Sequence, residues 1–276
     1  MQPLLLAALV VLGEPDPSDD IDPADHTVVS DRPDFANSSI TVPRGGLQLE
    51  VGVKADLTPG GSRRFPVGIP TAIRLGITRR LELRFFDAET AGWIDHRGAI
   101  EPRESFGAKV RLLDEDWKRW RPAVALQPLM QIGFQRGVLP VADLTLIVTQ
   151  PFGELVMLDM NFGGEYELGS PHHQSVGGFV AGSLGVQVHP STLLYTEVYV
   201  TGTSNIARSL RWGTDGGLVV SLTPRFAVDL AARVERFGGR TAVALLSGVT
   251  GLLVLPCHPS QRLTTRRPVC RLRARG

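Results

Sequence analysis

The stretch DRPDFANSSITVPRGGLQLEVGV, residues 31–53, passes from polar and turn-forming residues into a strict alternation of apolar and polar side chains. Leucine or valine stands at every odd position of residues 47–53, while Gln48, Glu50 and Gly52 lie between them. Because successive side chains of a β-strand point to opposite faces, this period of two predicts a strand with one apolar and one polar face. Repetition of the pattern along the chain is what decides the fold class.

Further segments with the same period, or with a short apolar run between turn-forming residues, follow through most of the chain. The 30 glycines and 20 prolines favour frequent turns and few long helices. Two of the segments, 143–150 and 241–253, are apolar on both faces, so the pattern does not orient them. The predicted strands lie near residues 46–53, 69–77, 81–86, 105–112, 122–133, 143–150, 155–168, 176–188, 192–201, 214–222, 226–235 and 241–253.

Connections between these strands alternate between short turns and longer, glycine-rich loops. Short turns at one end and long loops at the other, with an even number of antiparallel strands, are typical of outer-membrane β-barrels. About eight strands already reach the limit at which side chains fill a barrel with a dry core, so a wider barrel prefers polar side chains inside and apolar ones outside. We therefore expect an all-β, up-and-down antiparallel transmembrane β-barrel of about twelve strands. The short turns are expected at residues 78–80, 114–121, 151–154, 189–191 and 223–225.

The alternation predicts which charged side chains face the lumen. An Arg or Lys that faced lipid near the bilayer midplane would cost roughly 2–4 kcal/mol, although the same residues would also suit the wet face of a soluble sheet. Mixed charges in a lumen either select solutes by charge and hydrogen bonding or neutralise one another as a structural network, and both interpretations stay open. The lumen and selectivity candidates are Glu50, Arg74, Glu82, Arg84, Lys109, Arg111, Asp159, Glu197, Asp229 and Arg233.

The two ends of the chain differ from the strand-rich middle. We expect residues 1–13 to be a signal-peptide remnant, 14–45 an acidic N-terminal segment, 46–255 the barrel and 256–276 a basic, disordered tail. The apolar run in the first part is too short to span a bilayer but suits a signal peptide, although no basic residue precedes it and no A-x-A site follows. A buried strand and a start codon assigned too far downstream are the alternatives. Cys257 and Cys270 in the tail are given no role.

Several segments resemble a known family when they are taken in order. They are DRPDF (31–35), VPRGGLQLEVGV (42–53), TAIRLGITRRLELRF (71–85) and GGLVVSLTPRFAVDLAARV (216–234). Together they are similar to a family of bacterial outer-membrane transporters associated with a phenol-degradation (MetA) pathway. The resemblance implies the outer membrane of a Gram-negative bacterium, a barrel of about twelve strands and solute passage. The name of the family does not imply enzymatic breakdown of phenol. An arginine-rich tail in place of a last strand with a terminal aromatic residue departs from the family, either as a periplasmic extension or as a frameshifted end.

The same resemblance marks an N-terminal family motif. If the segment is a small plug, Asp31, Arg32 and Asp34 would pair with lumen charges, whereas a family-specific capping or linker role is equally open. The motif consists of Asp31, Arg32, Pro33, Asp34 and Phe35.

Three functions compete at this point. The first is diffusion of a small solute of unidentified structure, aromatic or hydrophobic by the family resemblance, through a charge-lined lumen; it predicts solvent-accessible Arg74, Glu82 and Lys109. The second is a sealed structural or adhesive barrel, which predicts that these residues pair with one another. The third is a barrel hydrolase using His172 or His173, which we disfavour because adjacent side chains on an extended chain point in opposite directions.

The expected partners and cofactors follow from the barrel. We expect a non-enzyme that contacts outer-membrane lipid, a small solute and the outer-membrane assembly machinery. No cofactor or metal is expected. The near balance of 29 basic and 28 acidic residues offers no case for a nucleic-acid partner.

Overall fold

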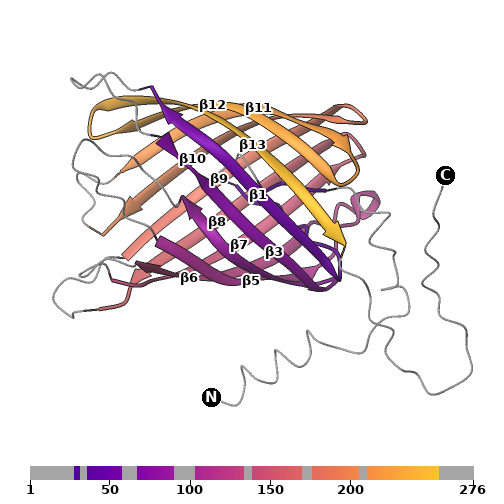
Figure 1. Ribbon diagram of the computed structural model, residues 1–276, viewed down its shortest axis with the longest axis horizontal. Helices are drawn as coiled ribbons and strands as arrows, with labels where there is room; N and C mark the ends of the chain where they lie inside the picture. Colours follow the sequence, from indigo (N-terminus) through magenta and orange to yellow (C-terminus); the bar gives the residue numbers. More distant parts are fainter. Residues whose placement is uncertain are drawn as a thin grey trace, which may run out of the picture.

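The structure is a computed structural model in which the chain forms one closed antiparallel sheet (Figure 1). It describes residues 28–31, 36–57, 67–89, 103–133, 139–169, 176–204 and 210–254. The strands are β1 (Gly46–Asp56), β2 (Val67–Gly68), β3 (Pro70–Thr78), β4 (Leu81–Glu89), β5 (Arg103–Leu113), β6 (Ala123–Gly133), β7 (Val141–Phe152), β8 (Val156–Glu167), β9 (Val176–His189), β10 (Thr192–Thr203), β11 (Arg211–Thr223), β12 (Phe226–Phe237) and β13 (Arg240–Val254).

Each strand pairs with its neighbours in chain order, and β1 also pairs with β13, which closes the barrel. The two-residue β2 is a continuation of β3 rather than a separate wall strand. Lys54 pairs with Gly68 and Val51 pairs with Thr71, so the register against β1 is the same on both sides of the break at Ile69. The wall therefore has twelve strands, and the predicted fold class is confirmed, with each of the twelve predicted strands overlapping one observed strand.

The two faces of the wall differ as the alternation predicts. Gln48 and Glu50 are 2% and 0% exposed, whereas Leu49 between them is 44% exposed. Val198 and Leu230, near the middle of their strands, are likewise exposed at the outer surface. Buried polar groups and exposed apolar ones invert the arrangement of a water-soluble protein, and an outer apolar band is what a bilayer requires.

Of the two strands predicted to be apolar on both faces, β7 turns the polar Asp143, Thr145 and Thr149 inward and exposes Leu144 and Leu146, so that prediction is wrong for β7. β13 does turn apolar residues inward, where they pack against other parts of the barrel. In β13, Leu246 packs inward against Tyr195, and Leu252 packs against Val28 and Val42 of the chain that precedes β1. The inward apolar residues of β13 thus have apolar partners within the lumen. Alternation alone could not show this, because it does not reveal what else the barrel contains.

Short turns gather at one end of the barrel, including Arg79–Arg80, Pro190–Ser191 and Pro224–Arg225. The connection between β5 and β6 carries a short 3₁₀ helix, Trp117–Arg119, next to a bridge between Asp116 and Arg121. In the part of the chain that the structure describes, no helix combines the length and the apolar composition needed to cross a bilayer.

Several expectations concern residues outside the described ranges and stay expectations. They are the signal-peptide remnant, the basic tail with its two cysteines, the pair His172 and His173, and the motif residues Arg32, Pro33, Asp34 and Phe35.

Candidate functional site

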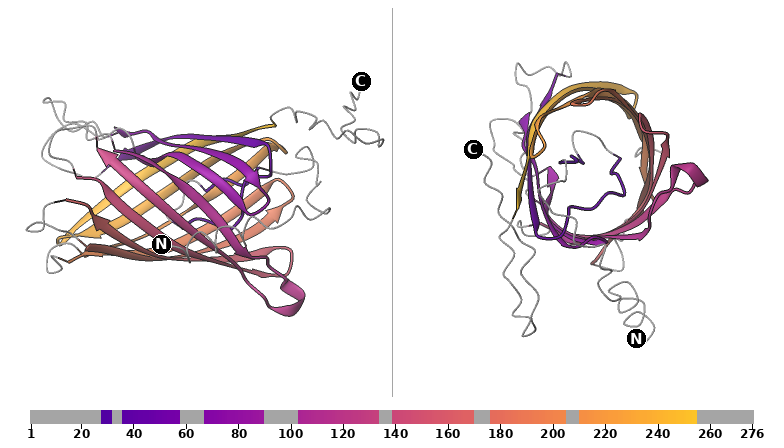
Figure 2. Two further views of the ribbon diagram at one scale, coloured as in Figure 1. Left: turned by 90° about the horizontal axis from the view of Figure 1, so that it is seen from below. Right: turned by 90° about the vertical axis from the view of Figure 1, so that its right-hand side faces the viewer.

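The described residues that precede β1 lie inside the barrel, as the view along the barrel axis shows (Figure 2). We call residues 28–31 and 36–45 the inner segment. At the short-turn end, the backbone amide of Val28 donates to the carbonyl of Pro224 at 2.7 Å, and the Thr41 hydroxyl donates to the carbonyl of Arg79 at 2.7 Å. The inner segment therefore enters and leaves the lumen at the end where the short turns lie.

Between these two points, the inner segment reaches the far wall of the barrel. The Ala36 amide donates to Glu197 Oε2 on β10 at 2.5 Å. Asn37 exchanges two hydrogen bonds with the Asn161 side chain on β8, at 2.9 and 2.8 Å. The Ser39 amide donates to the Thr149 hydroxyl on β7 at 2.9 Å. Wall side chains thus satisfy backbone groups that would otherwise be buried without partners.

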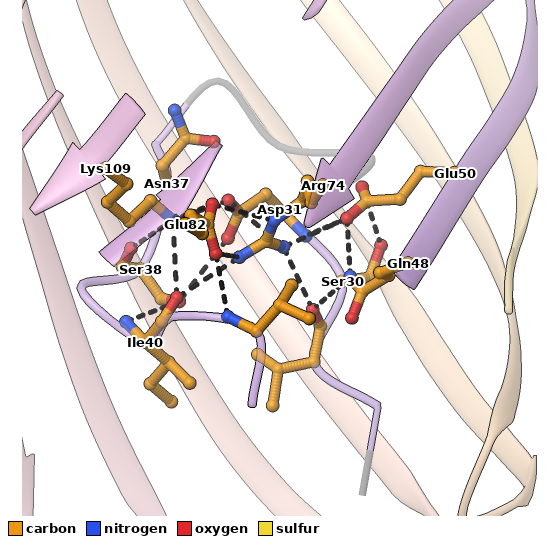
Figure 3. Close-up of polar contacts among 12 residues, drawn as sticks. Ser30, Asp31, Asn37, Ser38, Ile40, Gln48, Glu50, Arg74, Glu82 and Lys109 are labelled. Carbon is orange, nitrogen blue, oxygen red and sulfur yellow. Dashed lines mark hydrogen bonds and ion pairs between the residues drawn. The ribbon is translucent and has the colours of Figure 1, made fainter. Parts of the chain in front are cut away.

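On the near wall, Arg74 of β3 is the centre of the polar contacts (Figure 3). Its Nε and Nη2 donate to the two carboxylate oxygens of Glu82, each at 3.0 Å, which is a bidentate pair. Its Nη1 donates to Glu50 Oε1 at 3.0 Å. Arg74 also donates to the carbonyls of Val29 and Ile40 at 3.2 Å, so one guanidinium joins two wall strands to the inner segment.

Asp31 brings a third carboxylate to the same place from the inner segment. Its Oδ2 lies 2.6 Å from Arg84 Nη1, 2.7 Å from Lys109 Nζ and 3.3 Å from Arg74 Nη1. Burial alone would raise the pKa of the Asp31 carboxyl, but attraction to Arg74, Lys109 and Arg84 outweighs burial and holds that pKa well below its ordinary value. Asp31 is therefore an ionised carboxylate shared by three cations.

We call the six side chains the charge network: Asp31, Glu50, Arg74, Glu82, Arg84 and Lys109. Its three cations and three carboxylates are equal in number. The five wall side chains are each at most 1% exposed. Burial of an isolated charge would cost several kcal/mol, and the attraction between the paired charges offsets this desolvation cost.

A second polar row crosses the opposite wall. The strand registers place Asp159, Ser183, Glu197, Asp215 and Arg233 side by side on β8 to β12. Asp215 Oδ2 accepts from Arg233 Nε at 2.9 Å and lies 2.8 Å from its Nη2, and Asp159 accepts from the Thr149 hydroxyl. This wall carries more acid than base in that row, in contrast to the neutral charge network.

The ten lumen candidates fall into three groups in the structure. Eight are buried at 8% exposure or less: Glu50, Arg74, Glu82, Arg84, Lys109, Asp159, Glu197 and Asp229. Arg233 is partly buried beside Asp215. Arg111 instead pairs with Asp114 and Glu115 at the short-turn end and does not contact the charge network.

Arg74, Glu82 and Lys109 are at most 1% exposed, because the inner segment covers them, and so they lack the solvent accessibility that the hypothesis of an open pore predicts. Asp215 was not among the candidates, although it lies within a predicted strand. Glycines at 213, 216 and 217 interrupt the alternation of apolar and polar residues around Asp215, so the sequence pattern does not show which face of the strand Asp215 lies on.

Comparisons with known proteins give a consistent result at the level of fold. No protein-family model and no curated protein matches the chain. Among solved structures, the COG4313 outer membrane channel from Pseudomonas putida F1 is similar with a TM-score of 0.57 and 12% identity, covering 85% of this chain and 100% of that one. This chain therefore shares its β-barrel fold with an outer-membrane channel.

Two porins support the same assignment. The NanC porin has a TM-score of 0.52 and 8% identity over 74% of this chain and 98% of its own. The KdgM porin, in complex with disordered oligogalacturonate, has a TM-score of 0.50 and 8% identity over 73% and 98%. Together with the apolar outer surface, this fold agrees with the expected location in the outer membrane.

Proposed function

We propose that this protein is an outer-membrane barrel of a Gram-negative bacterium that passes small solutes by diffusion through its charge-lined lumen. The observation that carries the proposal is the inversion of the wall, with apolar side chains outside and charged ones inside a barrel of twelve strands. A barrel of this size is wider than its own side chains fill, which leaves the lumen to water, solutes and the inner segment. The likeness to porins and channels supports the same function.

In this proposal the inner segment is the constriction past which solutes move. It crosses the lumen from the short turns to Glu197, Asn161 and Thr149, so a solute meets both the segment and the wall at that level. Charge and hydrogen bonding at such a constriction select solutes. We propose Asp159, Glu197 and Asp229 as wall residues that determine this selectivity, and a small aromatic or hydrophobic solute follows from the resemblance to the phenol-degradation family.

A sealed structural or adhesive barrel is the second candidate. The observation in its favour is the charge network, in which Arg74, Glu82 and Lys109 pair with one another or with Asp31 beneath the inner segment. A neutral, fully paired cluster is what a permanently closed interior would contain. The two candidates differ in a property that can be measured directly, which is the passage of ions.

Planar-bilayer conductance of the refolded, full-length protein tests the proposal. We expect stepwise conductance, and we expect Asp229→Asn to shift the reversal potential in a salt gradient toward anions because it removes a lumen carboxylate. Glu154→Gln is the matched control, since Glu154 is exposed in the short turn before β8 and its replacement should leave the reversal potential unchanged. Silence from protein that is shown to be folded and inserted would establish the sealed barrel instead.

A further inference from the structure

Asp31 differs from the other carboxylates of the charge network in where it comes from. Glu50 and Glu82 belong to wall strands β1 and β4. Asp31 belongs to the inner segment and is therefore not part of the wall, although its side chain contacts the wall (Figure 3). One oxygen, Oδ2, accepts from both Arg84 and Lys109 within 2.7 Å. This is how a protein binds the carboxylate of a ligand.

Within the described part of the chain, the charge network without Asp31 keeps three cations and the two wall carboxylates Glu50 and Glu82. Removal of Asp31 takes away a carboxylate that contacts all three cations directly. Loss of a partner from a buried ion-pair cluster is costly, so the vacated position favours another anion. At this buried position, converging Arg and Lys donors are strong ligands for a carboxylate.

We propose that Arg74, Arg84 and Lys109 form a carboxylate-binding site on the lumen wall that Asp31 occupies in this structure, and that a solute bearing a carboxylate competes with Asp31 for it. The inference rests on the proposed function, because the solute must reach the lumen. It assigns the solute a chemical class that the fold alone does not give.

Exchange at this site is favourable in its charge balance. A solute carboxylate that replaces Asp31 returns the same charge to the same donors, so no cation is left unpaired during the bound state. The remaining contacts of the inner segment with the far wall use neutral backbone groups of Ala36, Asn37 and Ser39. Release of Asp31 therefore removes the charged contact of the inner segment with the near wall and loosens the segment, which keeps its hydrogen bonds from Arg74 to the carbonyls of Val29 and Ile40.

Calorimetric titration of the refolded, full-length Asp31→Ala variant with acetate tests the site. The truncation leaves space and three donors where the carboxylate was, so acetate should bind at least about tenfold more tightly than to the wild type, a ratio that corresponds to 1.4 kcal/mol. Asp159→Ala is the matched control, because Asp159 is another buried lumen carboxylate but accepts its bond from the neutral Thr149. The site is supported if acetate binds to Asp31→Ala and this binding is lost in the double variant that also carries Lys109→Gln. The site is overturned if acetate binds equally to Asp31→Ala and Asp159→Ala, or to neither.

A measurement on the wild type covers the case in which Asp31→Ala does not fold. Acetate, but not chloride at equal concentration, should speed amide hydrogen exchange at Ser39 and Val42, because displacement of Asp31 loosens the inner segment. Unchanged exchange in saturating acetate overturns the site. Conductance separates failure of this site from failure of the proposed function. If the protein conducts but acetate does not compete with Asp31, only the carboxylate site is rejected. If the folded protein binds acetate but does not conduct, the site stands and the channel function is rejected.

Discussion

At the scale of single residues, the lumen shows how a barrel buries charge without filling its interior with apolar side chains. Arg74 is able to sit at 1% exposure because its planar guanidinium meets Glu82 with two parallel bonds and still reaches Glu50. A lysine in its place would be a single point charge without that fork. The identity of each side chain, and not only its charge, therefore matters in the charge network.

The pH dependence of docking follows from Asp31. Its pKa is lowered by docking, so its contribution to docking is fully present above the ordinary aspartate pKa of 3.8 and is lost only as the pH falls through the lower, docked value. We expect amide hydrogen exchange at Val42 to report a docked inner segment throughout pH 5 to 8, apart from the ordinary base catalysis of exchange.

The control for this prediction is Asp31→Asn, which has no carboxyl to titrate at this position. Its docking should be weaker than that of the wild type across the same pH range. Undocking of the wild type between pH 7 and pH 5 would contradict the assignment of Asp31 as the ionised partner of Arg84 and Lys109.

At the scale of elements, the inner segment docks against the wall through one close backbone crossing. A Cβ at Gly76 of β3 would lie 2.0 Å from the carbonyl oxygen of Pro43 and 2.5 Å from that of Val42. The Gly45 amide donates to the Gly76 carbonyl at 2.9 Å, so the two backbones touch directly. Glycine at this position is what allows the segment to turn out of the lumen into β1.

We expect Gly76→Ala to displace the inner segment while the barrel still forms. The added methyl group overlaps backbone, which cannot rotate away as a side chain can, so the hydrogen bond from the Val42 amide to Glu82 should break. Amide exchange at Val42 should rise severalfold by NMR in detergent micelles. Gly164→Ala on β8 is the control, since a Cβ there meets nothing within 4 Å and exchange at Val42 should not change.

The elements were predictable to different degrees. The wall strands follow from alternation because lipid on one side and polar lumen on the other impose a period of two. The docked position of the inner segment does not follow, because Ala36, Asn37 and Ser39 dock through backbone groups that every residue carries. The sequence allows the hypothesis that Asp31 pairs with charges of the wall. It does not show which charges these are, because the wall strands are brought together only by closure of the barrel.

At the scale of the whole molecule, the outer surface sets the energetics of insertion. Apolar residues such as Leu144, Val198 and Leu230 are more than half exposed along the strands. In water such a surface would drive association, whereas in a bilayer it contributes to stability. The same wall thus has its apolar face toward lipid and its charges toward the lumen.

We expect an outward-facing arginine to cost more at mid-strand than at the turn end. Val198 is near the middle of β10, and Leu155 lies in the short turn before β8; they are 63% and 62% exposed. Val198→Arg should lower the free energy of unfolding in lipid vesicles by about 2–4 kcal/mol, and Leu155→Arg by about 0–1 kcal/mol, measured by denaturant titration. Equal costs for the two variants would contradict a membrane-embedded band centred on the strands.

The seam between β1 and β13 also orders events during biogenesis. β1 and β13 are the first and the last in chain order of the strands that the structure describes, and the barrel is closed only when they meet. The Ser30 hydroxyl bonds the Thr250 hydroxyl at 2.8 Å across 220 positions of the chain, so this contact of the inner segment waits for the final strand. Contacts of such long range form late. A fully docked inner segment is therefore a property of the finished molecule, and its arrival marks the moment at which a folding intermediate becomes a completed barrel.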